Sequence, residues 1–399
     1  MDAHERKAAS GAAGEAVNKW PVLLMVRSLE HGGCERDLTK IALNLDRDRF
    51  EPHVGIFRSG FRRQELEAAK VPILDLPVRS FMNRTVLEGF RKMGDYIRTH
   101  GIQLVHAFDV PMDLFATPVA RRFGVPAIVT SQLSYRSLYS RGSRLALRLT
   151  DRLSHRVVVN SRAVGDSLTR EFGVPRRKIY LCYNGVDSKE FYAERRSRPA
   201  RLEGASLIVG SVCVMRPEKR VDWLIRAFTE ISRIDPRARL ALVGSGPETH
   251  RLKELSESLG LSGACIFEES QADVAPWMRA IDIYVNSSLS ESFPNGLLEA
   301  MACGCCVIGS NVGGIPELIT HMQDGLIFDA GRSEDLSAML GLAATDSQLR
   351  QKLQMKAAET AHQRFSIALA AQRVGALYEE LLAKRAFYQP AEISSVNSR

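Results

Sequence analysis

The sequence has no long apolar run and no apolar segment near its start. None of its apolar stretches reaches the roughly 18 to 20 residues that a membrane-spanning helix needs. Residues 1–19 carry mixed charge instead of the apolar core of a secretory signal peptide, and we expect them to form a disordered tail. The sequence therefore predicts a cytoplasmic protein.

Cysteine is scarce as well. The seven cysteines are an odd number, and most lie inside apolar runs, so a disulfide framework is not expected. Cys303, Cys305 and Cys306 are close together, but no second Cys or His pair stands at the distance of a zinc site. We interpret these three cysteines as packed core residues and expect no metal site.

The sequence also lacks a dinucleotide-binding loop and the charge pattern of a nucleic-acid-binding protein. Gly244-Ser-Gly246 lacks the third glycine of a dinucleotide-binding loop. The net charge of +8 favours an anionic partner, for which nucleic acid, a phospholipid surface and a sugar nucleotide all qualify. The basic residues are scattered without interleaved aromatics, so we expect no nucleic-acid partner.

What the sequence does contain is a regular alternation of short apolar runs and longer amphipathic segments, which is typical of parallel α/β sheets. Its 399 residues favour more than one domain. The alternation pauses over a polar, basic stretch at 186–206 and then resumes. The expected strands are 22–26, 54–57, 73–76, 104–108, 127–130, 157–160 and 179–183, and then 207–214, 240–243, 265–267, 281–285, 306–308 and 326–328.

These patterns predict two similar α/β lobes that face each other across a cleft. We place the N-terminal domain at 20–185, the linker at 186–206 and the C-terminal domain at 207–365. A C-terminal helix at 366–385 is expected to cross back to the first domain, and a tail follows at 386–399.

The segment from Glu291 to Glu299 is the strongest candidate site. It follows the expected strand 281–285, and Pro294 suits the start of a helix. The unpaired amides of such a helix start, here those of Asn295 and Gly296, attract phosphate. Two carboxylates beside a phosphate would repel it, so Glu291 and Glu299 are better suited to bind hydroxyl groups. From spacing alone, the alternative remains open that Glu291 is a loop acid and Glu299 a solvated helix position.

This segment resembles the E-x7-E signature of family 4 glycosyltransferases, which are retaining enzymes. Further segments resemble the same family in the same order over residues 20–380. They are Gly32-Gly33-Cys34-Glu35-Arg36, Val158-Val159-Asn160-Ser161, Tyr183-Asn184-Gly185-Val186-Asp187, Arg216-Pro217-Glu218-Lys219, Val243-Gly244-Ser245-Gly246-Pro247 and Gly313-Gly314-Ile315-Pro316-Glu317. The resemblance implies the GT-B fold, in which two Rossmann-like, doubly wound domains face each other across a cleft.

The resemblance also implies roles for matching residues. Glu291 would bind hydroxyls of the transferred sugar, and Glu299 would bind the ribose. The start of the helix at Asn295, Gly296 and Leu297 would hold the diphosphate. Lys219 would stabilise the leaving nucleotide as charge develops. From the opposite lobe, the loop at Gly32 and Gly33 would contact the sugar phosphate, although on sequence alone a simple strand-to-helix turn explains this glycine pair better.

One departure from the family pattern concerns the donor phosphate. The family often has an arginine five residues before the lysine, where this chain has Val214. Either Arg216 reaches the phosphate by another route, which is the interpretation we favour, or Lys219 acts with less help. His106 matches a family histidine that faces the sugar, and its alternative is a hydrogen-bonded core position. Asp109 follows closely and is either an acid–base group or a turn residue. We name no general base, because in such enzymes the leaving phosphate takes the acceptor's proton.

Residues 135–156 form a basic, leucine-containing stretch. Six arginines (Arg136, Arg141, Arg144, Arg148, Arg152 and Arg156) stand against the single acid Asp151. Such a stretch either lies on an anionic membrane surface or forms an ordinary solvated helix face, and the sequence does not separate the two.

We therefore predict a retaining glycosyltransferase, in particular a hexosyltransferase, that uses a nucleotide-diphosphate sugar. UDP is the expected nucleotide and GDP the alternative. The expected acceptor is a hydroxyl of a glycan or a lipid-linked molecule in cell-surface polysaccharide or glycolipid synthesis, with the enzyme peripheral on an anionic inner membrane face. No cofactor or metal is expected to be required. The competing function is that of a same-fold sugar-nucleotide 2-epimerase or another sugar-phosphate enzyme.

Overall fold

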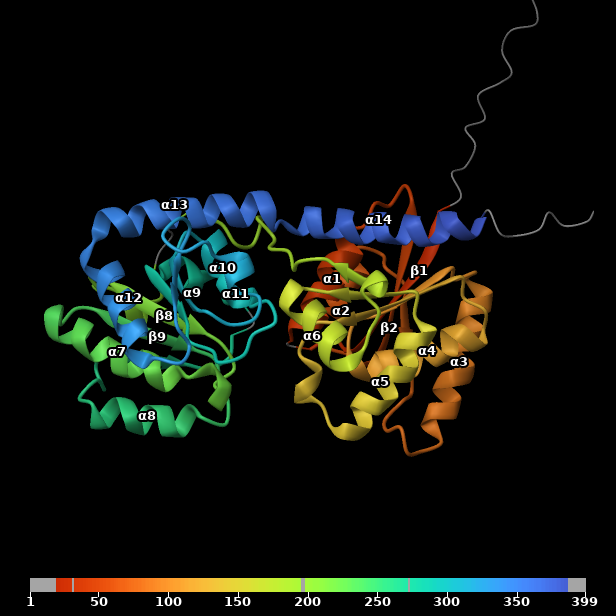
Figure 1. The fold of residues 1–399 in the computed structure, drawn as a ribbon, viewed down its shortest axis with the longest axis horizontal. Coiled ribbons are helices and arrows are strands. Elements are labelled where there is room, and N and C mark those ends of the chain that lie inside the picture. The colour runs from red at the N-terminus through yellow and green to blue at the C-terminus, as the bar shows by residue number, and fades with distance from the viewer. Residues whose placement is uncertain (1–18, 31, 195–197, 272, 387–399) are drawn as a thin grey trace, which may run out of the picture.

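The computed structural model describes residues 19–386 except 31, 195–197 and 272. Figure 1 shows two lobes side by side, with two long helices, α13 (Ser347–Arg364) and α14 (Ile367–Ala386), lying end to end along one side of both. The predicted tails at 1–19 and 386–399 fall almost entirely outside the described residues.

The N-terminal lobe is built on a seven-stranded parallel sheet with the order β3-β2-β1-β4-β5-β6-β7. Its strands are β1 (Trp20–Ser28), β2 (Phe50–Arg58), β3 (Ile73–Asp75), β4 (Leu104–Ala107), β5 (Ala127–Gln132), β6 (Arg156–Val159) and β7 (Ile179–Leu181). Its helices are α1 (Gly33–Asn44), α2 (Arg63–Ala68), α3 (Thr85–Thr99), α4 (Val110–Arg122), α5 (Arg141–Leu153) and α6 (Arg162–Phe172), with short 3-10 turns η1 (Arg136–Leu138) and η2 (Arg176–Lys178).

The C-terminal lobe repeats the plan with six parallel strands in the order β10-β9-β8-β11-β12-β13. They are β8 (Ile208–Val212), β9 (Arg239–Val243), β10 (Cys265–Glu268), β11 (Ile283–Asn286), β12 (Cys306–Ser310) and β13 (Leu326–Phe328). Around them lie α7 (Val221–Ile234), α8 (Thr249–Ser258), α9 (Ala275–Ala280), α10 (Asn295–Ala302), α11 (Ile315–Leu318) and α12 (Ser333–Thr345), with η3 (Ala200–Leu202) and η4 (Pro217–Lys219).

Both sheets have the strand order of a doubly wound fold, in which ligands bind beyond the carboxyl ends of the strands. Each of the thirteen expected strands is found, because central parallel strands are covered on both faces and read as continuous apolar runs. Cys303, Cys305 and Cys306 are buried in the apolar cores, as the packed-core interpretation predicts.

The connection between the lobes is packed rather than loose. Val186 bridges to Ser366 just before α14, and Phe191 and Leu202 are buried in the core of the C-terminal lobe. Helix α14 returns to the N-terminal lobe, where residues such as Val374 and Leu377 join its core (Figure 1). Within the described residues, no helix is both long and apolar enough to cross a bilayer.

Candidate functional site

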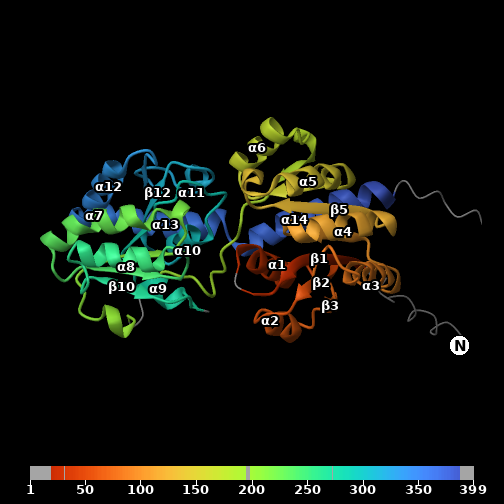
Figure 2. The same ribbon diagram turned by 90° about the horizontal axis from the view of Figure 1, so that it is seen from below.

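The candidate site lies where the two lobes meet (Figure 2), at the loops that follow β1 and β11. Gly33, at the start of α1, approaches so closely that a Cβ there would lie 3.5 Å from the side-chain nitrogen of Asn295 on the other lobe. Two sequence-predicted segments, the Gly32-Gly33 loop and the start of α10, are therefore brought together. A side chain at Gly32 would collide with Glu35.

Glu291 is fixed in the loop between β11 and α10. Its Oε1 accepts hydrogen bonds from Lys219 Nζ at 2.5 Å, Ser288 Oγ at 2.8 Å and Asn286 Nδ2 at 3.3 Å. The Lys219 and Glu291 side chains are only 22% and 11% exposed. The fold thus pairs Lys219 of η4 with Glu291, so these two predicted site residues lie next to each other.

The start of α10 presents free amides. Pro294 stands one residue before the helix as its N-cap, rather than within the first turn as the sequence suggested. Among the described residues, none accepts a hydrogen bond from the backbone N–H of Asn295, Gly296 or Leu297. The Leu297 side chain is buried, so only its amide is available to a ligand. Such a helix start is suited to bind an anion.

Gly296 is required by close packing beneath this helix start. A Cβ at this position would lie 2.7 Å from Tyr284 Oη and 3.2 Å from the carbonyl oxygen of Val212, at the end of β8. Any larger residue would push the start of α10 away from the sheet.

Asp37 is a site residue that the sequence analysis missed. It accepts a hydrogen bond from Asn295 Nδ2 at 3.3 Å across the cleft, while Asn184 Nδ2 donates to Asn295 Oδ1 at 2.7 Å. Burial raises the pKa of the Asp37 carboxyl to about 6. Its position directly after Gly-Gly-Cys-Glu-Arg, on the first turns of α1, was the signal that could have identified it.

Glu299 forms an ion pair with Arg36 of the opposite lobe. Burial raises the pKa of the Glu299 carboxyl to about 7, against the opposing effect of the Arg36 charge. Glu291 and Glu299 therefore each face a different cation. Arg36 was part of the recognised loop motif, but the sequence did not predict which acid it would meet.

The loop that carries Lys219 is held under backbone strain. Arg220 follows it in the left-handed conformation, with φ of 48°, which side-chain-bearing residues seldom adopt. Ser287 Oγ donates to the carbonyl oxygens of Lys219 and Arg220 at 2.8 and 3.0 Å. The Arg220 guanidinium lies 4.1 Å from the centre of the Trp223 ring and bonds to Asp222. The strained turn is thereby fixed from both sides.

Arg216 and Val214 both lie at the surface of this loop. Among the described residues, the Arg216 side chain forms one ion pair, a long one of 3.9 Å with Glu218, and it is more than half exposed. Val214, which occupies the family's arginine position, is also exposed. The Arg216 side chain is therefore free to turn toward an anion, while its carbonyl oxygen accepts a hydrogen bond from the Lys219 amide at 3.0 Å.

His106 lies in the core, at the end of β4. Its ring is fully buried, with Nδ1 2.6 Å from Tyr378 Oη on α14 and Nε2 2.8 Å from Ser131 Oγ. Burial lowers the pKa of this histidine to about 3, so the ring is neutral at physiological pH. The ring lines a small cavity of about 30 Å³ together with Asp37. None of the His106 surface is exposed to solvent, and the ring faces this small cavity.

Asp109, two positions beyond β4, is a capping residue. Its carboxylate accepts hydrogen bonds from the amides of Met112 at 2.9 Å and Arg27 at 2.8 Å. It therefore holds the start of α4 against the end of β1.

Glu317, the last residue of the Gly313-Gly314-Ile315-Pro316-Glu317 motif, joins the two lobes. Its carboxylate accepts hydrogen bonds from the backbone amides of Arg162 at 2.9 Å and Ala163 at 3.0 Å, at the start of α6. Tyr183 Oη donates to it at 2.9 Å. A carboxylate at a helix N-terminus is favourable, so Glu317 ties α11 of one lobe to α6 of the other.

Comparison with known families identifies the chain. Residues 31–190 match the model described as Glycosyltransferase Family 4, and residues 194–360 match Glycosyl transferases group 1. The chain belongs to this glycosyltransferase family. The two matches follow each other and take in most of both lobes.

The chain is 31% identical over 210 residues to the N-acetyl-alpha-D-glucosaminyl L-malate synthase of Bacillus anthracis, covering 51% of this chain and 55% of that protein. It is 33% identical over 199 residues to the D-inositol 3-phosphate glycosyltransferase of Rhodococcus jostii, covering 47% and 44%. The matches thus span about half the length of these glycosyltransferases. The Anabaena HepE complex with UDP has a TM-score of 0.77 at 23% identity, covering 90% of this chain and all of HepE. The shared fold is the GT-B fold that the motifs predicted.

Proposed function

We propose that this protein is a retaining glycosyltransferase, in particular a hexosyltransferase, that transfers a sugar from UDP to an acceptor hydroxyl. The observation that carries the proposal is the free helix start of α10 beside the Lys219–Glu291 pair, facing the Gly32-Gly33 loop. UDP is favoured because Anabaena HepE, which has the same fold, was solved with UDP and with UDP-glucose.

The proposed roles follow from the contacts. The amides of Asn295, Gly296 and Leu297 would hold the diphosphate, as anions bind at helix starts. Lys219 would stabilise the charge that develops on the leaving UDP, and the effect of this charge is large in a cleft from which water is excluded. Glu291, whose Oε1 already accepts three hydrogen bonds, would receive sugar hydroxyls on its other oxygen.

The acceptor reaction needs no protein nucleophile in this proposal. The leaving phosphate takes the proton of the acceptor hydroxyl as that hydroxyl attacks the same face of the sugar. His106 would line the acceptor side as a neutral ring, since its pKa is far below physiological pH. We propose that no resident metal or cofactor takes part, so activity should survive a chelator.

The acceptor is proposed to be a glycan or a lipid-linked molecule at the cytoplasmic face of an anionic membrane. The alternative function is that of a sugar-nucleotide 2-epimerase, which would convert the sugar nucleotide into an isomer without an acceptor. The two functions differ in their products: the transferase releases UDP only as sugar reaches an acceptor or water, whereas the epimerase yields an isomeric sugar nucleotide.

The decisive experiment is a thermal-shift screen of UDP, GDP and their sugars, followed by product analysis with each nucleotide that binds. UDP should raise the melting temperature of the wild type but not of Gly296→Ala, whose added Cβ displaces the anion-binding helix start. Absence of a shift with every nucleotide diphosphate would refute the assignment, and an isomerised donor would establish the epimerase instead.

A further inference from the structure

The positive charge of this chain is concentrated in one part of the N-terminal lobe. Residues 135–180, which run from η1 through α5 and α6 to η2, contain eleven Lys and Arg against three Asp and Glu. This excess equals the net charge of +8 of the whole chain, so all other residues together are electrically balanced. Charge of one sign that is concentrated in one region creates a potential that attracts partners of the opposite charge.

The outer side of this region carries apolar residues that a solvated helix would not expose. Leu138 on η1 is 69% exposed, and Leu145 and Leu149 on α5 are 67% and 56% exposed. Leu145 and Leu149 stand four residues apart and so share one face of the helix. Arg141, Arg148 and Arg152 are exposed on the same side. A row of leucines bordered by arginines is typical of a helix that lies in a membrane interface.

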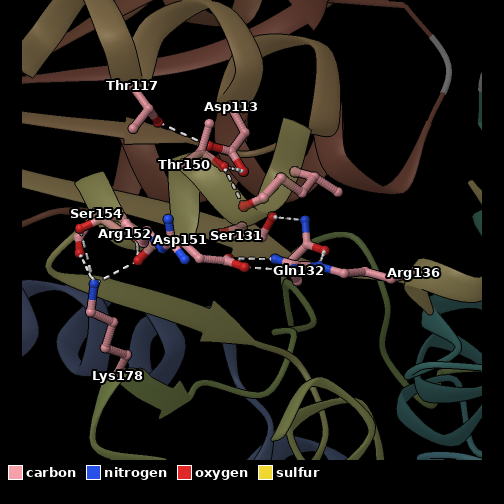
Figure 3. Close-up of polar contacts among 11 residues, drawn as sticks. Asp113, Thr117, Ser131, Gln132, Arg136, Thr150, Asp151, Arg152, Ser154 and Lys178 are labelled. Atoms are coloured by element: carbon pink, nitrogen blue, oxygen red, sulfur yellow. Dashed lines mark hydrogen bonds and ion pairs between the residues drawn. The ribbon is translucent and has the colours of Figure 1, made fainter. Parts of the chain in front are cut away.

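The structure corrects the interpretation of two residues in this stretch. Arg136 was counted with the surface arginines, but it is 1% exposed and forms a two-pronged ion pair with Asp151, both bonds at 2.6 Å (Figure 3). Its Nε also donates to Gln132 Oε1 at 2.7 Å. The single acid of α5 is therefore turned inward and neutralised, which leaves the outer face without a carboxylate of its own and anchors the helix firmly.

A groove adjoins this face. A cavity of about 470 Å³ is lined by Arg148 and Arg152 of α5, by Arg177 and Lys178 of η2, and by Phe172 at the end of α6. Lys178 Nζ donates to the carbonyl oxygens of Asp151 at 2.5 Å and Ser154 at 2.8 Å, which fixes η2 against the end of α5 (Figure 3).

The arginines of the groove remain available. Among the residues that the structure describes, no carboxylate pairs with Arg148, Arg152 or Arg177. Three cations that lack counter-ions and border one cavity are complementary to phosphate groups.

We propose that η1, α5 and η2 form a docking face for an anionic phospholipid bilayer. Leu138, Leu145 and Leu149 would insert at the level of the headgroups, and the groove of Arg148, Arg152 and Arg177 would receive lipid phosphates. This inference gives the residues and the lipid chemistry for the membrane association in the proposed function. It does not depend on catalysis, because membrane binding and UDP binding are measured separately.

The test is flotation of the full-length protein with phosphatidylcholine vesicles, with and without phosphatidylglycerol, at low and at physiological salt. The protein should float only with phosphatidylglycerol. Each interfacial arginine contributes about 1 kcal/mol, so Arg148→Ser, Arg152→Ser and Arg177→Ser together should weaken binding on the order of 100-fold at low salt. Leu145→Ser with Leu149→Ser should reduce the binding that persists at physiological salt.

The matched control removes the same charge from the other lobe, where Arg226, Arg233 and Arg237 are exposed. Changing these three to Ser should leave flotation unchanged, and UDP should still stabilise every variant. The proposal is overturned if anionic vesicles do not bind, or if the control loses as much binding as the groove variant. It is also overturned if soluble polyphosphate displaces the vesicles while the leucine variant binds normally, which would indicate a soluble polyanion as the partner.

Discussion

The Lys219–Glu291 pair offers the sharpest test of the candidate site, through Lys219→Met. At 2.5 Å and an effective dielectric constant near 20, two unit charges attract by about 6 to 7 kcal/mol. Desolvation of both groups and the residual exposure of each side chain offset most of this attraction. The methionine variant leaves Glu291 with only the neutral donors Ser288 and Asn286. We expect its free energy of unfolding to fall by about 2 to 3 kcal/mol.

The assay is urea unfolding of four proteins: wild type, Lys219→Met, Glu291→Gln and the double variant. If the pair interacts as the contacts indicate, the double variant should lose less than the sum of the single losses, with a coupling of about 1 to 2 kcal/mol. Additivity within about 0.5 kcal/mol would refute the reasoning about the pair. Repeating the unfolding measurements with UDP separates stability from donor binding. UDP should raise the free energy of unfolding of Lys219→Met much less than that of the wild type.

Three further predictions concern Gly313 and Glu317 near the site and Asp113 in the interior of the N-terminal lobe. Gly313→Ala should destabilise the fold and abolish donor binding in thermal-shift assays, because φ is 54° and the new Cβ would lie 1.6 Å from the Glu291 carbonyl oxygen; Gly263→Ala, where nothing lies within 4 Å, should be neutral. Burial raises the pKa of Asp113 to about 7 from 3.8, so the stability linked to its proton is present below pH 4 and is lost as the pH rises through 7. Asp113→Asn should remove this loss, and its unfolding free energy should exceed that of the wild type by roughly 2 to 4 kcal/mol at pH 8 but not at pH 4. Glu317→Ala should speed hydrogen exchange at the amides of Arg162 and Ala163, which it caps across the cleft, and unchanged exchange there would contradict the proposed tie between the lobes.

The strands could be predicted from the sequence because buried parallel strands are continuous apolar runs, which can be recognised without knowing the neighbouring strands. The helix start at Asn295 was predictable for a similar reason, since Pro294 and the preceding strand are local signals. Contacts between residues that are far apart in the sequence could not be predicted. Arg136 looked like a surface arginine because charged residues seldom lie in a core, and only the fold brings Asp151 to it.

The same limitation explains why Arg36 and Asp37 were not predicted as site residues. Both lie on α1, and their partners Glu299 and Asn295 lie on the opposite lobe more than 250 positions away. The sequence indicates that the loop after β1 approaches a ligand, but the contacts it makes depend on how the two lobes close. The family resemblance supplied the location of the site, and the geometry supplied the cations that neutralise its acids.

These pairings have a consequence for how a donor would enter. Glu299 is paired with Arg36 of the other lobe, and Asn295 donates a hydrogen bond to Asp37. A ribose bound to Glu299 would compete with Arg36 for the same carboxylate, so donor binding would exchange a contact between the lobes for a contact with the ligand. Glu317 on α11 remains untouched by that exchange, since its partners lie at the start of α6. The lobes would therefore loosen at Arg36 while staying joined at Glu317, which allows a sugar nucleotide to enter without complete separation of the two sheets.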